Sequence, residues 1–553
     1  MFRVQLWTTL AIVFLTQAGW VRPALALAEP AHPPFSKPNI VIILADDMGF
    51  SDIAPYGGEI DTPNLSRLAE NGLKYTQFYN TGRCCPTRAS LITGLHPAQT
   101  GIGHMTEGPL NRESEDRHII GYRGRLNNEV TTIAEVLKSA GYHTIHSGKW
   151  HLGYHDPENK PLQRGFDDHY GLLAGASNYF TPRDDRGGRG LTRGNDKIEA
   201  VSTTDDAFYT TDAFTDEAIN YIGETEKNTP FFLYLAYTAP HWPLQAFEED
   251  IAKYRGQYRK GWEQLRAERY QRQVESGLID PDTTPMSERD AIAWDSLPEK
   301  KQDEMDLRMA IYAAQIDRMD QNIGKLLKSL EAQDRLENTI IFFLSDNGGC
   351  AEGGMLGSGE VYDLEERNEG YFTNYGQAWA NASNTPFRLY KHFVHEGGMA
   401  TPMIVHWPAG IEAKDEWRRD PAYLPDLMAT AVELSGATYP ETRDGEAVQP
   451  MVGTSLARTF DGSALDRNGP MFWEHEGNRA IRIGDWKLVS RGTSRFDFGG
   501  EQSWELYDLS ADRSELNDLA GEQPDRVKEL SAAWWDWAKS HRVVPNRKKD
   551  VEE

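Results

Sequence analysis

The stretch Asn39-Ile40-Val41-Ile42-Ile43-Leu44, which runs directly into Ala45-Asp46-Asp47, sets the fold class of this chain. Similar apolar runs that lead into polar residues cover residues 142–145, 231–235 and 340–344. Unbroken apolar runs of this length are typical of strands buried on both faces, as in a parallel sheet covered by helices. Helical patterns lie between the runs, at residues 62–71, 131–140, 211–224 and 306–334. The alternation predicts an α/β fold.

The polar residues that follow these strands are predicted to form one site, because open α/β sheets bind ligands at the carboxyl ends of their strands. Asp46 and Asp47 follow the first run, and Asp346 and Asn347 follow the last. One Asp-Asp pair is commonly a solvated turn or a helix cap. Two such pairs after buried strands would repel each other without a cation. Their oxygen atoms suit Ca²⁺ or Mg²⁺ better than zinc, and Ca²⁺ accepts irregular geometry more easily.

The segment Cys84-Cys85-Pro86-Thr87-Arg88 precedes a helical run. Pro86 suits the first turn of a helix, where its missing N–H has no partner to lose. The N-terminus of a helix favours anions, and Arg88, one turn further on, can reach the same place. Taken alone, the segment could equally be a buried cysteine pair at an ordinary helix start. A protein-tyrosine-phosphatase loop is excluded, because that loop needs a longer spacing between its Cys and Arg.

Basic residues follow the predicted strands elsewhere. Lys149 and His151 lie in one motif after residues 142–145, His241 follows Pro240, and Lys391 precedes a Gly-Gly pair. Any one of them could be a surface or capping residue. As a set, they are candidates for binding an anion and moving protons. No role is assigned to four other histidines: His104, His146, His392 and His395. His104 could line the pocket.

Together these segments resemble the sulfatase family, in order and across most of the chain. The insertion at residues 246–305 and the approach to Lys391 at residues 383–388 resemble its larger bacterial arylsulfatase-like branch. The segments that carry the resemblance are Asp46-Asp47, Cys84 to Gly94, Gly148-Lys149-x-His151, Pro240-His241, Asp346-Asn347-Gly348, Lys391 with Glu396-Gly397-Gly398, Ile481-Arg482-x-Gly484-Asp485-Trp486-Lys487-Leu488 and Glu505-Leu506-Tyr507-Asp508-Leu509. The resemblance implies an alkaline-phosphatase-like α/β fold with a large mixed sheet flanked by helices. It also implies one Ca²⁺ per chain and the oxidation of Cys84 to formylglycine by a formylglycine-generating enzyme.

The implied reaction is the hydrolysis of a sulfate ester, carried by a small molecule or a glycan. The hydrated aldehyde at residue 84 attacks sulfur with help from the metal and Asp346, and a covalent sulfate forms. His241 protonates the leaving alcohol, and His151 deprotonates the second hydroxyl, which expels sulfate. The side chains that offset the charge of the sulfate are Arg88, Lys149 and Lys391.

Two other functions remain open at this point. A phosphonate or phosphate ester hydrolase on the same scaffold would need nearly the same charged groups. A protein that binds sulfate or a glycan without turnover would also keep them. Modification of Cys84 together with turnover would reject the second alternative.

Composition limits the partners and the location. Lys and Arg number 58 against 84 Asp and Glu, a net charge of −26, which argues against nucleic acid or an anionic membrane as a partner. Residues 1–28 have the basic start, short apolar core and small-residue sites of a cleaved signal peptide. We therefore expect an exported protein, periplasmic or secreted, without stable membrane insertion. Three cysteines do not make a disulfide scaffold.

The remaining patterns predict the domain boundaries. Residues 37–455 are expected to form the catalytic domain, with a largely helical insertion at 246–305 and a long functional loop at 353–384. Residues 456–553 are expected to form a smaller C-terminal subdomain. Its predicted antiparallel strands and single helix cover residues 470–474, 478–483, 486–490, 504–509 and 524–540.

Overall fold

The computed structural model describes Met1 and residues 37–106, 119–153, 155–183, 190–198, 208–363, 372–465, 467, 469–492 and 503–543. The predicted signal peptide, residues 1–28, lies outside this part of the chain apart from Met1. Among the described residues, no helix is long and apolar enough to cross a membrane. The described residues from 37 onward belong to one compact unit.

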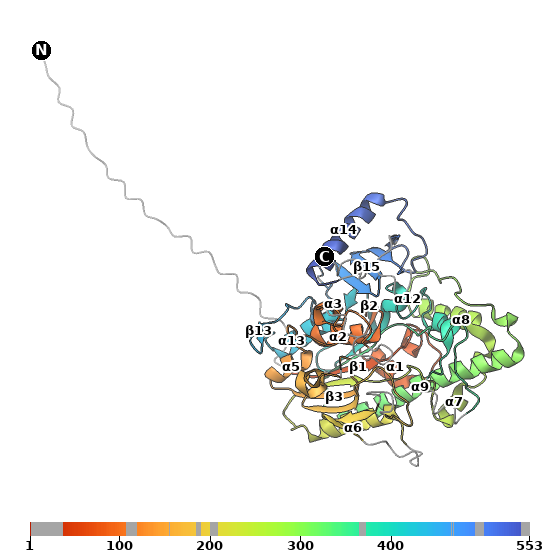
Figure 1. Cartoon of the computed structure of the whole chain (residues 1–553), viewed down its shortest axis with the longest axis horizontal. Coiled ribbons are helices and arrows are strands. Elements are labelled where there is room, and N and C mark those ends of the chain that lie inside the picture. The colour runs from red at the N-terminus through yellow and green to blue at the C-terminus, as the bar shows by residue number, and fades with distance from the viewer. Residues whose placement is uncertain are drawn as a thin grey trace. The chain divides into compact units, whose positions relative to one another are not determined.

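A mixed eleven-stranded sheet forms the centre of this unit (Figure 1). The four strands predicted from the apolar runs are β1 (Asn39–Ala45), β3 (His143–Lys149), β7 (Phe231–Ala236) and β8 (Thr339–Ser345). They lie side by side in the order β8-β1-β7-β3, and all pair in parallel. The prediction of a parallel core buried on both faces is therefore confirmed.

Further strands make the sheet mixed. They are β2 (Leu73–Tyr79), β4 (Asp168–Leu172), β5 (Leu191–Arg193), β6 (Asp196–Lys197), β9 (Ala400–His406), β10 (Glu416–Arg418) and β11 (Ala422–Tyr423). Strand β9 runs antiparallel to both β8 and β2, and β5 and β6 extend the opposite end as an antiparallel hairpin. A separate short hairpin is formed by β12 (Thr442–Arg443) and β13 (Glu446–Ala447).

Helices cover both faces of the sheet because alternate residues of β1 point to opposite sides. Val41 and Ile43 join one hydrophobic cluster with α1 (Pro63–Glu70), α6 (Thr210–Glu224) and α9 (Glu299–Ala332). Ile40 and Ile42 join a second cluster with α2 (Cys84–Thr93), α5 (Ile133–Ser139) and α13 (Pro425–Ser435). The four predicted helices are confirmed, although α9 begins seven residues earlier than expected, at Glu299 rather than 306.

The insertion at 246–305 is largely helical, as predicted: it contains α7 (Glu248–Tyr254), α8 (Gly261–Glu275), two 3₁₀ helices and the first turns of α9, although residues 276–293 have no helix. One sequence prediction needs correction. The predicted loop at 353–384 ends in helix α11 (Gly376–Ser383). Shorter elements are α3 (Pro97–Thr100), α12 (Glu396–Met399) and the 3₁₀ helices Ala54–Tyr56, Pro157–Asn159, Pro161–Arg164, Gln257–Lys260, Trp294–Ser296 and Ala457–Asp461.

The predicted C-terminal sheet and helix are confirmed. The antiparallel strands, in order, are β14 (Met471–His475), β15 (Asn478–Ile483), β16 (Trp486–Ser490) and β17 (Glu505–Asp508). Helix α14 (Pro524–Ser540) packs on them through Trp534 and Trp537. Whether residues 456–553 form a separate subdomain remains a prediction.

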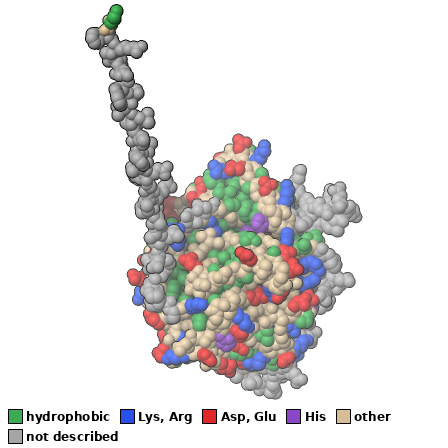
Figure 2. Space-filling view, turned by 90° about the vertical axis from the view of Figure 1, so that its left-hand side faces the viewer, with side chains coloured by type: hydrophobic (Ala, Val, Ile, Leu, Met, Phe, Trp, Pro, Cys, Tyr) green, Lys and Arg blue, Asp and Glu red, His purple; other side chains and the backbone are tan. Residues whose placement is uncertain are grey.

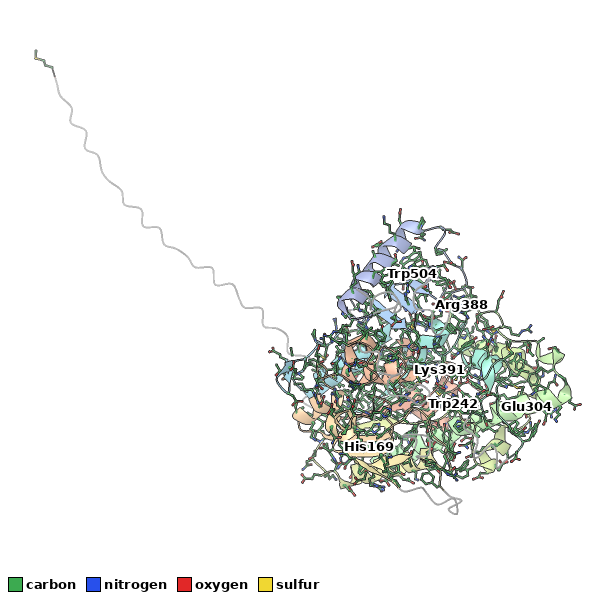
Figure 3. All side chains as sticks on the ribbon, viewed as in Figure 1. His169, Trp242, Glu304, Arg388, Lys391 and Trp504 are labelled. Atoms are coloured by element: carbon green, nitrogen blue, oxygen red, sulfur yellow. The ribbon has the colours of Figure 1, made fainter. Side chains whose placement is uncertain are left out.

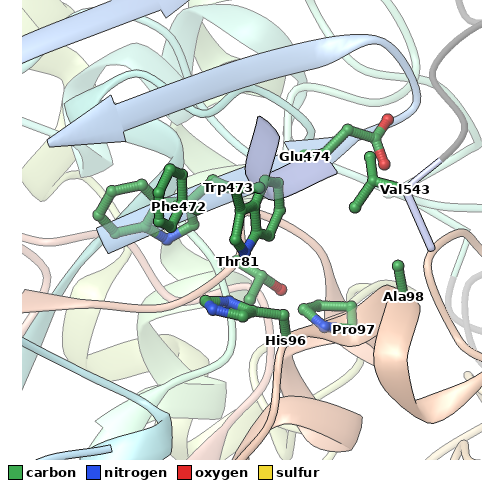
Figure 4. A pocket seen from close by; sticks show the side chains of 9 residues that line it. Thr81, His96, Pro97, Ala98, Phe472, Trp473, Glu474 and Val543 are labelled. Atoms are coloured by element: carbon green, nitrogen blue, oxygen red, sulfur yellow. The ribbon is translucent and has the colours of Figure 1, made fainter. Parts of the chain in front are cut away.

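Aromatic side chains dock this sheet against the rest of the unit. In Figure 4, Phe472 and Trp473 of β14 lie over His96 and Pro97 at the start of α3, around a narrow pocket. Burial lowers the pKa of His96 to about 3, so its ring stays neutral and packs as an aromatic group. These contacts hold the C-terminal strands against the segment that follows α2, and so against the central sheet.

Candidate active site

The ends of four neighbouring strands bring the predicted site residues together. Asp46 follows β1 and Asp346 follows β8, and the strands are in register where Ala45 pairs with Ser345. Lys149 is the last residue of β3, and His241 follows β7. Because these strands are parallel neighbours, their carboxyl ends share one edge of the sheet.

The oxygen-rich pairs form a buried cluster. Asn347 Nδ2 donates a hydrogen bond to Asp47 Oδ1 at 2.7 Å, and the Asp47 amide donates to Asp346 Oδ1 at 3.1 Å. Asp46 Oδ1 and Asn347 Oδ1 are buried without a hydrogen-bond partner. Ligand atoms of Asp46, Asp47 and His241 lie within 4.8 Å of one another. These oxygen atoms, together with the crowded carboxylates, fit a hard divalent cation.

Burial makes this cluster costly without a counter-charge. It raises the pKa of Asp46 well above its usual value, and the neighbouring Asp346 carboxylate raises it further. Burial also acts to raise the pKa of Asp47, but Lys391 and His241 outweigh it, so this pKa is lowered. Asp47 also has a left-handed backbone, with φ 64°, which costs an ordinary residue about 1–3 kcal/mol. Such strain is typical of a functional site.

Three cations face these carboxylates, and all three are buried. Arg88 Nη2 lies 2.7 Å from Asp346 Oδ2, Lys149 Nζ lies 2.6 Å from Asp46 Oδ2, and Lys391 Nζ lies 2.8 Å from Asp47 Oδ1. The predicted basic residues therefore converge on the predicted metal ligands, from α2, β3 and the segment before α12. Three cations are thus buried at one place inside an acidic protein, each paired with a carboxylate. On the face shown in Figure 2, acidic and basic side chains are interspersed instead.

The two adjacent cysteines lie in different surroundings. Cys84 is the first residue of α2, and its pKa is well below the usual value because of a hydrogen bond from Cys85, despite burial. Lys149, Lys391 and the His151 side chain lower it further. Cys85 instead belongs to a hydrophobic cluster, and burial raises its pKa. Only Cys84 therefore combines thiolate character with a position among the cations.

Comparison with known proteins identifies the family. A model of the sulfatase family matches residues 38–437, and a model of the C-terminal part of N-sulphoglucosamine sulphohydrolase matches residues 387–536. The chain belongs to the sulfatase family. It is 36% identical to an arylsulfatase of Klebsiella aerogenes over 453 residues, which cover 78% of this chain and 94% of that protein. It is 28% identical to mouse N-acetylgalactosamine-6-sulfatase over 483 residues, which cover 84% and 74%.

Solved structures show the same fold. The crystal structure of Ps i-CgsB aligns with a TM-score of 0.66 and 25% identity, over 94% of this sulfatase and 96% of that chain. BT4656, solved in complex with its substrate D-glucosamine-2-N,6-O-disulfate, aligns with a TM-score of 0.60 and 20% identity, over 93% and 100%. The predicted sulfuric ester hydrolase and its alkaline-phosphatase-like sheet are therefore confirmed.

The two candidate histidines of the sulfatase both follow Cys84 in the sequence, after different strands, and reach the same cluster. His151, with a left-handed φ of 56°, acts on the Cys84 thiol, as its effect on the Cys84 pKa shows. His241 Nε2 lies 3.4 Å from Asp47 Oδ2, and its Nδ1 lies 2.6 Å from the Trp242 carbonyl. Because that carbonyl can only accept a hydrogen bond, Nδ1 carries the N–H that donates to it, and Nε2 is the nitrogen that faces the site. Burial lowers the pKa of His241 to about 4.

Several residues at the site were not predicted from the sequence. Glu352 forms an ion pair with Arg83, the residue before Cys84, and accepts a hydrogen bond from the Trp242 indole. Arg269 of the insertion reaches Asp52, near the metal-ligand turn. Glu352 lies five residues after Asn347, which was the one available signal. For Arg269 there was none, because its partner lies 217 residues away.

Proposed function

We propose that this sulfatase works as an arylsulfatase-type enzyme with one Ca²⁺ and a formylglycine formed from Cys84. The single observation that carries the proposal is the position of Cys84. It opens a buried helix, beside two lysines and a histidine, while its neighbour Cys85 points into the core. A formylglycine-generating enzyme would therefore act on residue 84 before the chain folds, since the folded site buries this side chain.

The residues that would hold the metal are those of the buried oxygen cluster: Asp46, Asp47, Asp346 and Asn347. The donor set supports Ca²⁺, because all four supply oxygen and Ca²⁺ accepts irregular arrangements. The hydrated formylglycine would supply a hydroxyl nucleophile. The cation, when bound, would supply Lewis acidity. Asp46, Asp47 and Asp346 pair one for one with the three cations, so a divalent ion would give the site the net positive charge that a sulfate needs.

The protein's own residues would then do three things. Arg88, Lys149 and Lys391 would bind the sulfate oxygens and offset the charge that grows on them, in a buried site where such contacts are strong. A bound sulfate ester would raise the low pKa of His241 through its negative charge, so that Nε2 would take up a proton and give it to the leaving oxygen. His151, on the Cys84 side, would take the proton that must leave before sulfate is released.

For the substrate we propose a chemical class, and for the location we propose export from the cytoplasm. The relatives named after sulfated amino sugars, and the arylsulfatase of Klebsiella aerogenes, support a sulfate ester of a sugar or an aryl alcohol. We propose export to the periplasm or beyond the cell, on the basis of residues 1–28.

The test compares two esters that share one leaving group. Rates of 4-nitrophenol release from 4-nitrophenyl sulfate and from a 4-nitrophenyl phosphonate monoester should be measured for the native enzyme and for Cys84→Ala. We expect a higher kcat/KM for the sulfate ester and loss of both activities in the variant. A higher kcat/KM for the phosphonate would favour the phosphonate hydrolase alternative.

A further inference from the structure

An aromatic surface adjoins the proposed proton donor. Trp242 directly follows His241, and the centroids of their rings are 4.5 Å apart. Trp242 is half-buried, and the ring of Phe372 lies 5.4 Å from it at an interplanar angle of 34°. Phe372 is 57% exposed, more than any other aromatic side chain among the described residues. Trp242 and Phe372 therefore form a continuous apolar surface that begins next to His241, and an exposed surface of this kind beside a site is a candidate for covering by a ligand.

Trp242 is held in position from the nucleophile side of the site. Its indole Nε1 donates to Glu352 Oε2 at 2.9 Å, and Glu352 Oε1 lies 3.1 Å from Arg83 Nη2. Arg83 immediately precedes Cys84 and is buried. The contacts from Trp242 to Glu352 and from Glu352 to Arg83 therefore hold the indole ring in place relative to residue 84. Figure 3 labels Trp242 and Lys391.

The charges around this surface are paired. The Arg83 guanidinium neutralises Glu352, and together with Lys391 it holds the pKa of Glu352 well below its usual value despite burial. The surface offers a rigid indole and a more exposed phenyl ring, and the charges of Glu352 and Arg83 behind the indole compensate each other. It suits the flat apolar face of a ring, and it gives an acyclic or charged alcohol little to bind.

We propose that Trp242 and Phe372 form the binding surface for the leaving group, and that this group is a ring: an aryl group or the apolar face of a pyranose. The inference rests on the proposed function, because it places the ester oxygen beside His241 Nε2 and the sulfate among the three cations. The ring then stacks on Trp242, and Phe372 covers its outer part. Glu352 and Arg83 are positioning residues for the indole.

The experiment separates binding from turnover. Dissociation constants for phenyl sulfate, a monosaccharide 6-sulfate and inorganic sulfate should be measured by calorimetry in a Cys84→Ala background. Trp242→Ala and Phe372→Ala should each weaken binding of a ring ester roughly 2- to 10-fold, the range expected for a lost aromatic contact. Binding of inorganic sulfate should change by less than about twofold. Trp242→Phe should retain most of the affinity for the ring ester.

Trp535→Ala is the matched control, because Trp535 is also partly exposed but lies on α14. Loss of affinity for phenyl sulfate alone would identify an aryl subsite, and loss for the monosaccharide sulfate alone would identify a sugar subsite. Unchanged binding of both ring esters in Trp242→Ala and Phe372→Ala would overturn the inference, as would an equal loss for inorganic sulfate. Failure of the native-sequence enzyme, with Cys84 converted to formylglycine, to hydrolyse any sulfate ester would overturn the proposed function instead, and the binding results would still decide this inference.

Discussion

Replacing Arg269 by Met should destabilise the sulfatase although Arg269 is outside the catalytic set. Arg269 lies on α8 and is fully buried, with Nη1 2.6 Å from Asp52 Oδ1 and Nε 2.8 Å from Glu59 Oε2. The other Asp52 oxygen accepts hydrogen bonds from the Gly49 amide and the Tyr312 hydroxyl. The insertion thus supplies the cation that compensates the turn behind the metal ligands.

The expected loss is large because a charge would remain buried without its partner. Removing one member of a buried ion pair typically costs about 3–5 kcal/mol in the free energy of unfolding. Arg289→Met is the matched control on the same insertion. Its pair with Glu263 is 40% and 36% exposed, and such a pair contributes about 0–1 kcal/mol. Urea unfolding, followed by tryptophan fluorescence and circular dichroism together, measures both losses.

The pH dependence gives the sign of the effect. Burial raises the pKa of Asp52 while Arg269 lowers it, and Arg269 outweighs burial at Glu59, whose pKa is lowered. In the native protein, ionised Glu59 contributes to the free energy of unfolding at pH values above its pKa in the unfolded chain. This contribution is lost as pH falls through the lower pKa that Glu59 has in the folded protein. Without Arg269, both carboxyls would bind protons more readily, so the deficit of the variant should shrink between about pH 7 and pH 5. A deficit below about 1 kcal/mol at neutral pH, or one that grows on acidification, would refute this reasoning.

Three other predictions follow from contacts at or near the site. His241→Ala should cost about 10²–10⁴-fold on a sulfate ester of a poor leaving group and much less on nitrophenyl sulfate; equal losses across a leaving-group series would assign His241 to sulfate binding. Chelation should reduce activity by orders of magnitude, as should Asp346→Ala, with Ca²⁺ restoring only the chelated enzyme; recovery with zinc alone would show the ligand set to be misread. Lys487→Met removes the ammonium group that lies 2.9 Å from the buried Glu396 carboxylate, and should lower the free energy of unfolding by about 3–5 kcal/mol. The control Lys528→Met should change it little, and equal melting temperatures for the two variants would contradict the prediction.

The sequence predicted the elements whose periodicity is strong. Strands β1, β7 and β8 are unbroken apolar runs, and the helix at 524–540 has a clear apolar face, so each matched the structure closely. The run at 142–145 marked only the start of β3, which continues through polar residues to Lys149. Strands β2 and β9 were missed: β2 mixes polar and aromatic residues, and β9 contains Pro402. The first turns of α9 are dominated by charged residues, which hid the start of this helix. Helix α11 depends on tertiary packing, with the Trp379 indole donating to the Met305 carbonyl.

The site followed from the sequence only where a residue ends a strand or lies in a motif. Asp46, Lys149 and Asp346 were predictable because parallel strands share one edge. Contacts between distant loops were not predictable: Glu352 lies shortly after Asn347, but nothing local in the sequence pairs it with Arg83. The two histidines were predicted by motif, whereas their opposite approach to Cys84 and Asp47 required coordinates.

The most direct test of the account is the mass of the peptide that contains residues 83–88, taken from enzyme of measured activity. The account predicts an aldehyde at residue 84, trapped by a hydrazide reagent, and an unmodified thiol at Cys85. The fraction of aldehyde should rise and fall with specific activity across preparations. Full activity in a preparation whose Cys84 is entirely an intact thiol would contradict the account.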